Sequence, residues 1–149
     1  MSLNPNQFRS VTITLRLLEE RLADIERVIA QDEQGILYQR VAQFTPQQRA
    51  QMNEIIRAMR EQIRRAAEEF QLPGEEQNAA RYIVGTLSLS WESLEEIRSR
   101  KLKGYGAVDP ALRDTLDPIL KQLIRLLFSL TDVARGRTPT GSTNSDEEV

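Results

Sequence analysis

The feature that most constrains this sequence is a run of apolar residues, close to the N-terminus, spaced alternately by three and four positions. The run comprises Phe8, Val11, Leu15, Leu18, Leu22, Ile25 and Ile29. Because this spacing is close to one helical turn, the side chains form a single stripe along an α-helix. A helix with such a stripe must bury it against other helices, so the sequence predicts an all-α fold.

Three further segments have the same helical period. The helix that carries the stripe described above is the first of the four, and it is expected to begin near Asn6, with Asn6 as its N-cap. A second begins after Thr45-Pro46-Gln47-Gln48, where Thr45 caps the helix, Pro46 occupies its first position and Gln48 completes a capping box. Leu72-Pro73-Gly74 ends that helix, and a third is expected from about residue 75 to residue 101.

The last helical segment contains two Asp-Pro pairs, at Asp109-Pro110 and Asp117-Pro118. Each pair resembles an N-cap followed by proline in the first turn, so this segment is predicted to be broken or kinked near Pro118, with a break at Asp117 favoured. The apolar residues that follow cover more than half of the helix circumference. This helix should therefore be central to the fold, or part of its surface should meet another chain.

Four amphipathic helices joined by mostly short turns predict an antiparallel four-helix bundle over residues 1–136. Its interior is expected to include Leu87, Trp91 and Leu123. No segment alternates with period two, so no sheet is expected, and whether residues 31–44 continue the first helix stays open. Residues 137–149 are polar and end in acidic residues, which predicts a disordered acidic tail.

Composition excludes several classes of function. The chain has no cysteine and no histidine, which removes thiolate nucleophiles, imidazole bases and the usual zinc ligands. No cofactor or metal is therefore expected, a non-catalytic role is favoured, and the missing cysteines suit a reducing cytoplasm. The net charge of −2 argues against general affinity for nucleic acid, and no apolar stretch is long enough to span a membrane.

The densest cluster of positive charge lies beside a Gly-Tyr-Gly turn. It comprises the side chains Arg98, Arg100, Lys101 and Lys103, with Tyr105 in the turn itself. Together these five residues form the candidate partner-binding site, since cations and an exposed aromatic suit a protein interface. The simpler interpretation is a helix C-terminus, where cations are favoured by the helix dipole and Gly104 provides a left-handed cap.

Carboxylates offer one enzymatic alternative. Glu92 and Glu95 on one helix, with Asp114 and Asp117 on another, would have to gather around Mg²⁺, as in all-α nucleotide pyrophosphatases. The helical period places Glu92 and Asp114 away from the apolar faces of their helices, and Asp117 suits a cap, so both observations weigh against this arrangement.

The function predicted from these patterns is a non-catalytic helical interaction or scaffold module. A protein partner is expected, and a homodimer through the first or last helix would cover the apolar surface that exceeds one stripe. Two alternatives stay open. One is a Mg²⁺-dependent nucleotide hydrolase using the four carboxylates, and the other is a nucleic-acid-associated regulator using the basic turn.

Overall fold

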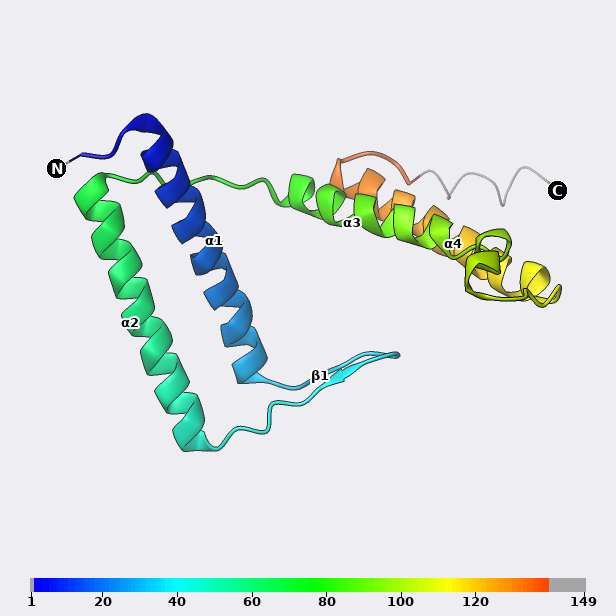
Figure 1. The fold of residues 1–149 in the computed structure, drawn as a ribbon, viewed down its shortest axis with the longest axis horizontal. Helices are drawn as coiled ribbons and strands as arrows, with labels where there is room; N and C mark the ends of the chain where they lie inside the picture. Colours follow the sequence, from blue (N-terminus) through cyan, green and yellow to red (C-terminus); the bar gives the residue numbers. More distant parts are fainter. Residues whose placement is uncertain (1, 140–149) are drawn as a thin grey trace. The chain divides into compact units, whose positions relative to one another are not determined.

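The computed structural model describes residues 2–139, and this part of the chain is mostly helical, which confirms the all-α class. The chain divides into two compact units, Met1–Glu75 and Glu76–Val149 (Figure 1). Each is a helical hairpin and is described by itself. The arrangement of four helices in one bundle over residues 1–136 stays a prediction, and residues 140–149 of the predicted acidic tail lie outside the described residues.

The first unit contains helices α1, Pro5–Ala30, and α2, Pro46–Phe70, which run antiparallel (Figure 1). The predicted start of α2 is confirmed, because Thr45 and Gln48 form a capping box around Pro46. The predicted cap of α1 is wrong by two residues. Asn4 rather than Asn6 is the N-cap, and it forms the same reciprocal capping box with Gln7.

The core of the first unit lies where the apolar stripes of α1 and α2 meet. Leu22, Ile29 and Ile56 are buried there, and several half-buried side chains pack around them: Leu18, Phe44, Met52, Met59 and Ile63. An ion pair between Glu26 of α1 and Arg60 of α2 borders this core. The predicted stripe of α1 therefore faces α2, although its member Ile25 is half exposed.

Residues 31–44 do not continue α1. They form a short β-hairpin of strands β1, Glu33–Gln34, and β2, Gln39–Arg40, with Glu33 opposite Arg40. The Asp32 carboxylate anchors its base by accepting a 2.7 Å hydrogen bond from the backbone N–H of Ala42. The expectation of no strand was wrong here, because strands of two residues are too short to show an alternating pattern.

The second unit contains α3, Ala79–Glu96, a 3₁₀ helix η1, Ser99–Tyr105, and α4, Leu112–Ala134. Helices α3 and α4 run antiparallel and pack along their length (Figure 1). The predicted break at Asp117 is wrong, since α4 continues through Pro118. A proline inside a helix costs about 3 kcal/mol. Leu120, two residues further along, is buried, and α4 packs against α3, so burial in this hairpin offsets the cost.

The core of the second unit is small. Leu120 and Ile124 of α4 are buried, and the rings of Trp91 and Phe128 lie 6.0 Å apart at one side of the hairpin. Leu123, expected in the interior, is 45% exposed. Leu87 and Trp91 are partly exposed within this unit, so the predicted interior is only partly assembled by α3 and α4 themselves.

Candidate functional site

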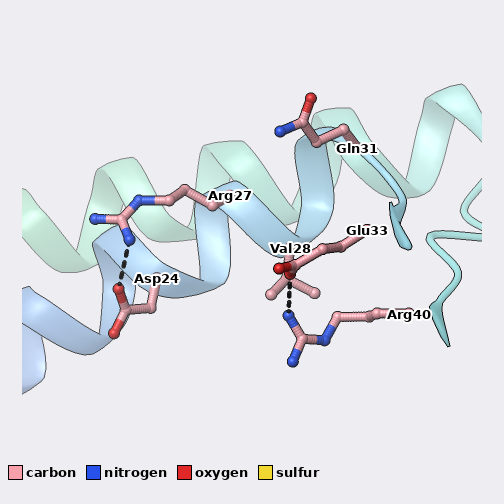
Figure 2. Close-up of a pocket in the computed structure, with 6 residues that line it drawn as sticks. All are labelled: Asp24, Arg27, Val28, Gln31, Glu33 and Arg40. Atoms are coloured by element: carbon pink, nitrogen blue, oxygen red, sulfur yellow. Dashed lines mark hydrogen bonds and ion pairs between the residues drawn. The ribbon is translucent and has the colours of Figure 1, made fainter. Parts of the chain in front are cut away.

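A cleft of about 600 Å³ lies where the end of α1 meets the β-hairpin (Figure 2). Its lining residues are Asp24, Arg27, Val28, Gln31, Glu33 and Arg40. The two cations are each paired with an acid: Arg27 with Asp24 at 3.1 Å, and Arg40 with Glu33 at 2.9 Å. Neutralised in this way, the cleft has no excess charge for an anion. Its lining residues include no hydroxyl or thiol nucleophile.

The β-hairpin next to this cleft presents an apolar tip. Glu33 accepts a 2.5 Å hydrogen bond from the hydroxyl of Tyr38 and also pairs with Arg40. Because the phenol donates to this carboxylate, the pKa of Tyr38 lies above its ordinary value. The Tyr38 ring covers Gly35 so closely that a Cβ at Gly35 would lie 2.5 Å from it. Ile36 and Leu37, between these two residues, are 101% and 96% exposed.

Sequence reasoning did not find this tip as a candidate site. The available signal was Gly35 followed by Ile36, Leu37 and Tyr38, a glycine and three residues with strong β or apolar character between two helices. The sequence leaves open whether these residues continue the first helix. The tertiary contacts of Glu33 and Asp32 decide that these residues form a hairpin.

The candidate partner-binding residues around the basic turn are only partly free. Arg98 forms hydrogen bonds to both carboxylate oxygens of Glu95, at 2.9 Å and 3.1 Å, and Lys101 pairs with Glu96 at 3.0 Å. Arg100 and Lys103 are exposed, and within residues 2–139 the structure gives neither of them an ion pair. The free positive charge of this turn is thus about half of what the sequence suggests.

Tyr105 is 89% exposed at the end of η1, as expected for a glycine-flanked loop. The predicted left-handed cap at Gly104 is wrong, because α3 ends at Glu96 and the positive φ, 144°, belongs to Gly106. A separate 3₁₀ helix therefore carries the basic residues. Arg100, Lys103 and Tyr105 remain the accessible part of the predicted site.

Asp117 joins α4 to the start of η1. Its carboxylate accepts a 2.9 Å hydrogen bond from the backbone N–H of Ser99 and a 2.7 Å hydrogen bond from the Ser99 hydroxyl. These two bonds from Ser99, assisted by Arg98 and Arg113, lower the pKa of Asp117 below its ordinary value of 3.8. Asp117 therefore caps η1 and not α4. Asp117 and Ser99 are 18 residues apart, so no local sequence pattern reveals this contact.

Replacing Asp117 with asparagine should change how stability depends on pH. An acid whose pKa is lowered by folding stabilises the folded state above its unfolded pKa, and this contribution is lost as the pH falls through the folded value. The native chain should therefore melt at a higher temperature than Asp117→Asn at neutral pH, and the difference should shrink well below pH 3.8. Thermal melts followed by Trp91 fluorescence over a pH series would measure this. A difference that does not change with pH would contradict the assignment.

The four carboxylates of the Mg²⁺ alternative are not gathered. Within residues 2–139, no group of three or more acidic side chains is arranged to hold a metal ion. Glu95 is paired with Arg98, and Asp117 is bonded to Ser99. Glu92 and Glu95 instead line a shallow cleft of about 480 Å³ together with Trp91, Glu96 and Lys101. This geometry gives the hydrolase alternative no assembled metal site in the part of the chain described.

Comparison with known proteins gives no match to any protein family, curated protein or solved structure. Among the described residues, no helix has the length and apolar character needed to cross a membrane.

Proposed function

We propose that this chain is a non-catalytic interaction module that presents apolar and basic surfaces on its two helical hairpins to a protein partner. The single observation that carries the proposal is the exposure of Ile36 and Leu37 at the hairpin tip. Two adjacent large aliphatic side chains in water lose the favourable free energy of burial, about 1.5–3 kcal/mol each. Binding of the tip in an apolar pocket of a partner would recover it.

The tip is also held in shape before a partner arrives. Glu33 binds both Tyr38 and Arg40, and the backbone N–H of Gly35 donates a 2.9 Å hydrogen bond to the carbonyl of Tyr38. A preorganised loop loses less conformational entropy on binding than a flexible one, which raises affinity. The charged residues Asp24, Arg27 and Arg40 beside the tip would form the polar rim that protein interfaces typically have.

The basic turn is a second surface within this proposal. Arg100, Lys103 and Tyr105 are accessible and would suit an acidic segment of a protein partner. The four-helix arrangement, the homodimer and the cytoplasmic location predicted from the sequence also belong to the proposal.

A pull-down from source lysate with the full chain as bait would test the proposed function. The double variant Ile36→Ser/Leu37→Ser should lose a partner that binds the tip, and Arg100→Glu/Lys103→Glu should lose one that binds the basic turn. The matched controls are Ile55→Ser, an exposed isoleucine of α2, and Lys121→Glu/Arg125→Glu, two exposed cations of α4.

The expected result is a protein captured by the native chain and by both controls, but lost with one of the two test variants. If the captured proteins are the same for all five baits, or if none rises above background, neither surface binds a partner. The proposed function would then be wrong in this form.

A further inference from the structure

Helix α4 exposes an apolar stripe on the side of the α3–α4 hairpin that α3 does not cover. Its five members, here named the α4 seam, are 45–59% exposed within their unit: Ile119, Leu123, Leu126, Leu130 and Val133. They follow one another at spacings of four, three, four and three. This is the 3.5-residue repeat by which one helix packs along another, and it continues over two heptads.

The charges of α4 lie on the opposite side from the seam. At about 100° per residue, the seam occupies a sector of roughly 80°, and every charged residue of the helix falls in a sector of roughly 120° centred about 180° away. These residues are Arg113, Asp114, Asp117, Lys121, Arg125 and Asp132. A surface helix normally directs its charges toward water, so a half-circumference without charge indicates a face that is buried in the functional state.

The flank of α3 on the same side of the hairpin has short, uncharged side chains. The helical period of an antiparallel pair places Thr86 and Ser90 beside the α4 seam, and puts the contact between Trp91 and Phe128 on the other flank. Thr86 and Ser90 are exposed. Short side chains let a further helix approach closely, because the distance between packed helices depends on the side chains at the contact.

A second copy of the seam has the right chemistry to cover it. Two seams bring no charge into contact, and a two-fold interface pairs the same patch from each chain. The outer face of α1 lacks this complementarity, since its exposed Ile13 and Leu17 share their sector with Arg21 and Asp24. Burying those charges against leucine would be costly.

The surface is also large enough for a stable pair. Helix α4 has 23 residues and is about 35 Å long, and a hairpin two helices wide spans about 20 Å. The product is roughly 700 Å² on each copy, close to the about 800 Å² per partner of standard protein interfaces.

We infer that two copies of this chain associate through the α4 seam, so that two α3–α4 hairpins form an intermolecular four-helix bundle. The inference rests on the proposed function and names a second copy as one partner of the module. The surfaces used by other partners, the hairpin tip and the basic turn, do not overlap with the seam residues.

The mass of the full chain in solution tests this inference. Light scattering over a concentration series should give twice the 17.1 kDa of one chain. Leu126→Glu, at the middle of the seam, should give the mass of one chain with its helical circular dichroism retained, because Leu126 is half exposed in its own hairpin. The matched control is Ile55→Glu, which changes an equally exposed aliphatic residue on α2 and should leave the dimer intact.

A cysteine cross-link gives a second readout that does not depend on destabilising the chain. The sequence has no cysteine, so a single Leu126→Cys can form a disulfide only with another copy. Leu126 is the centre of the seam, and it faces its own counterpart whether the two helices run parallel or antiparallel. Oxidation should yield a covalent dimer, and Ile55→Cys should yield far less.

A native chain with the mass of one copy would overturn the inference, and so would a Leu126→Glu variant that stays dimeric. If the native chain is a monomer and Leu126→Glu unfolds at lower denaturant, another part of the same chain covers the seam, which also overturns it. A monomeric native chain would remove the homodimer from the proposed function, but the pull-down with the tip and basic-turn variants would still test whether those surfaces bind another protein. Failure of this inference is therefore distinguishable from failure of the proposed interaction module.

Discussion

Leu22→Ala is expected to reduce the free energy of unfolding of the first unit by about 2–5 kcal/mol. Leu22 is 3% exposed and packs with Ile29 and Ile56 at the centre of the contact between α1 and α2. The mutation removes buried methyl groups and leaves a cavity that two helices alone can close only partly. Urea unfolding followed by circular dichroism at the helical minimum would measure the change.

The control for this prediction is Leu17→Ala on the same helix. Leu17 is among the exposed large aliphatic residues, so its truncation should cost no more than about 1 kcal/mol. Equal losses for the two variants would show that Leu22 does not hold the core position described for it.

The same variant tests whether the two units share one core. The chain has a single tryptophan, Trp91, which lies in the second unit, whereas circular dichroism reports on the helices of both. If Leu22→Ala shifts the Trp91 fluorescence transition together with circular dichroism, the four helices unfold cooperatively, as the predicted bundle requires. If only circular dichroism changes, each hairpin is stabilised separately.

Leu120→Ala is expected to have a comparable effect in the second unit, again about 2–5 kcal/mol. Leu120 is the most buried side chain of α4, it lies two residues after Pro118, and α4 packs against α3, so we expect its burial to support the helix through Pro118. Without it, the cost of the proline is less well offset, so local fraying of α4 should accompany the loss. Urea unfolding followed by Trp91 fluorescence would measure this change.

The neighbouring residue provides the control for Leu120. Lys121→Ala changes an exposed residue of α4, and its effect should be within about 0.5 kcal/mol. Hydrogen exchange of the α4 amides would show the predicted fraying directly. Protection that is unchanged around Pro118 in Leu120→Ala would contradict the role given to this contact.

Helix ends were predicted well where the capping residues are adjacent in sequence. Thr45 and Gln48 form the expected box, because both partners lie within one turn and need nothing else from the fold. Asn4-Pro5-Asn6-Gln7 has the same order of cap, proline and glutamine, and this likeness could have corrected the choice of Asn6. Local chemistry of this kind is fully present in the sequence.

The β-hairpin and the end of α3 could not be predicted in this way. Each depends on a carboxylate that reaches across the fold: Asp32 binds the backbone of Ala42, and Asp117 binds Ser99. Pairs that are ten and eighteen residues apart leave no periodic signal, since the helical period describes only neighbours within a few turns.

The candidate site was likewise visible only in part. The cluster of cations around Arg100 and Lys103 is evident from the sequence, but charge counting could not show that Arg98 and Lys101 are paired with Glu95 and Glu96. The exposure of the tip and of the α4 seam also needed the structure. An apolar stripe looks the same in sequence whether it faces its own hairpin or the solvent.

The sequence by itself determined the helical class, the amphipathic stripes and the two capping boxes that begin α1 and α2, because these follow from spacing and from contacts within one turn. Only the tertiary structure decided which apolar stripe of α4 is covered by α3 and which one is exposed. It also decided where the hydrogen bonds of Asp32 and Asp117 hold the β-hairpin and the start of η1. The physical reason is that burial and long-range hydrogen bonds depend on which segments meet in space, and helical periodicity specifies faces without specifying their partners.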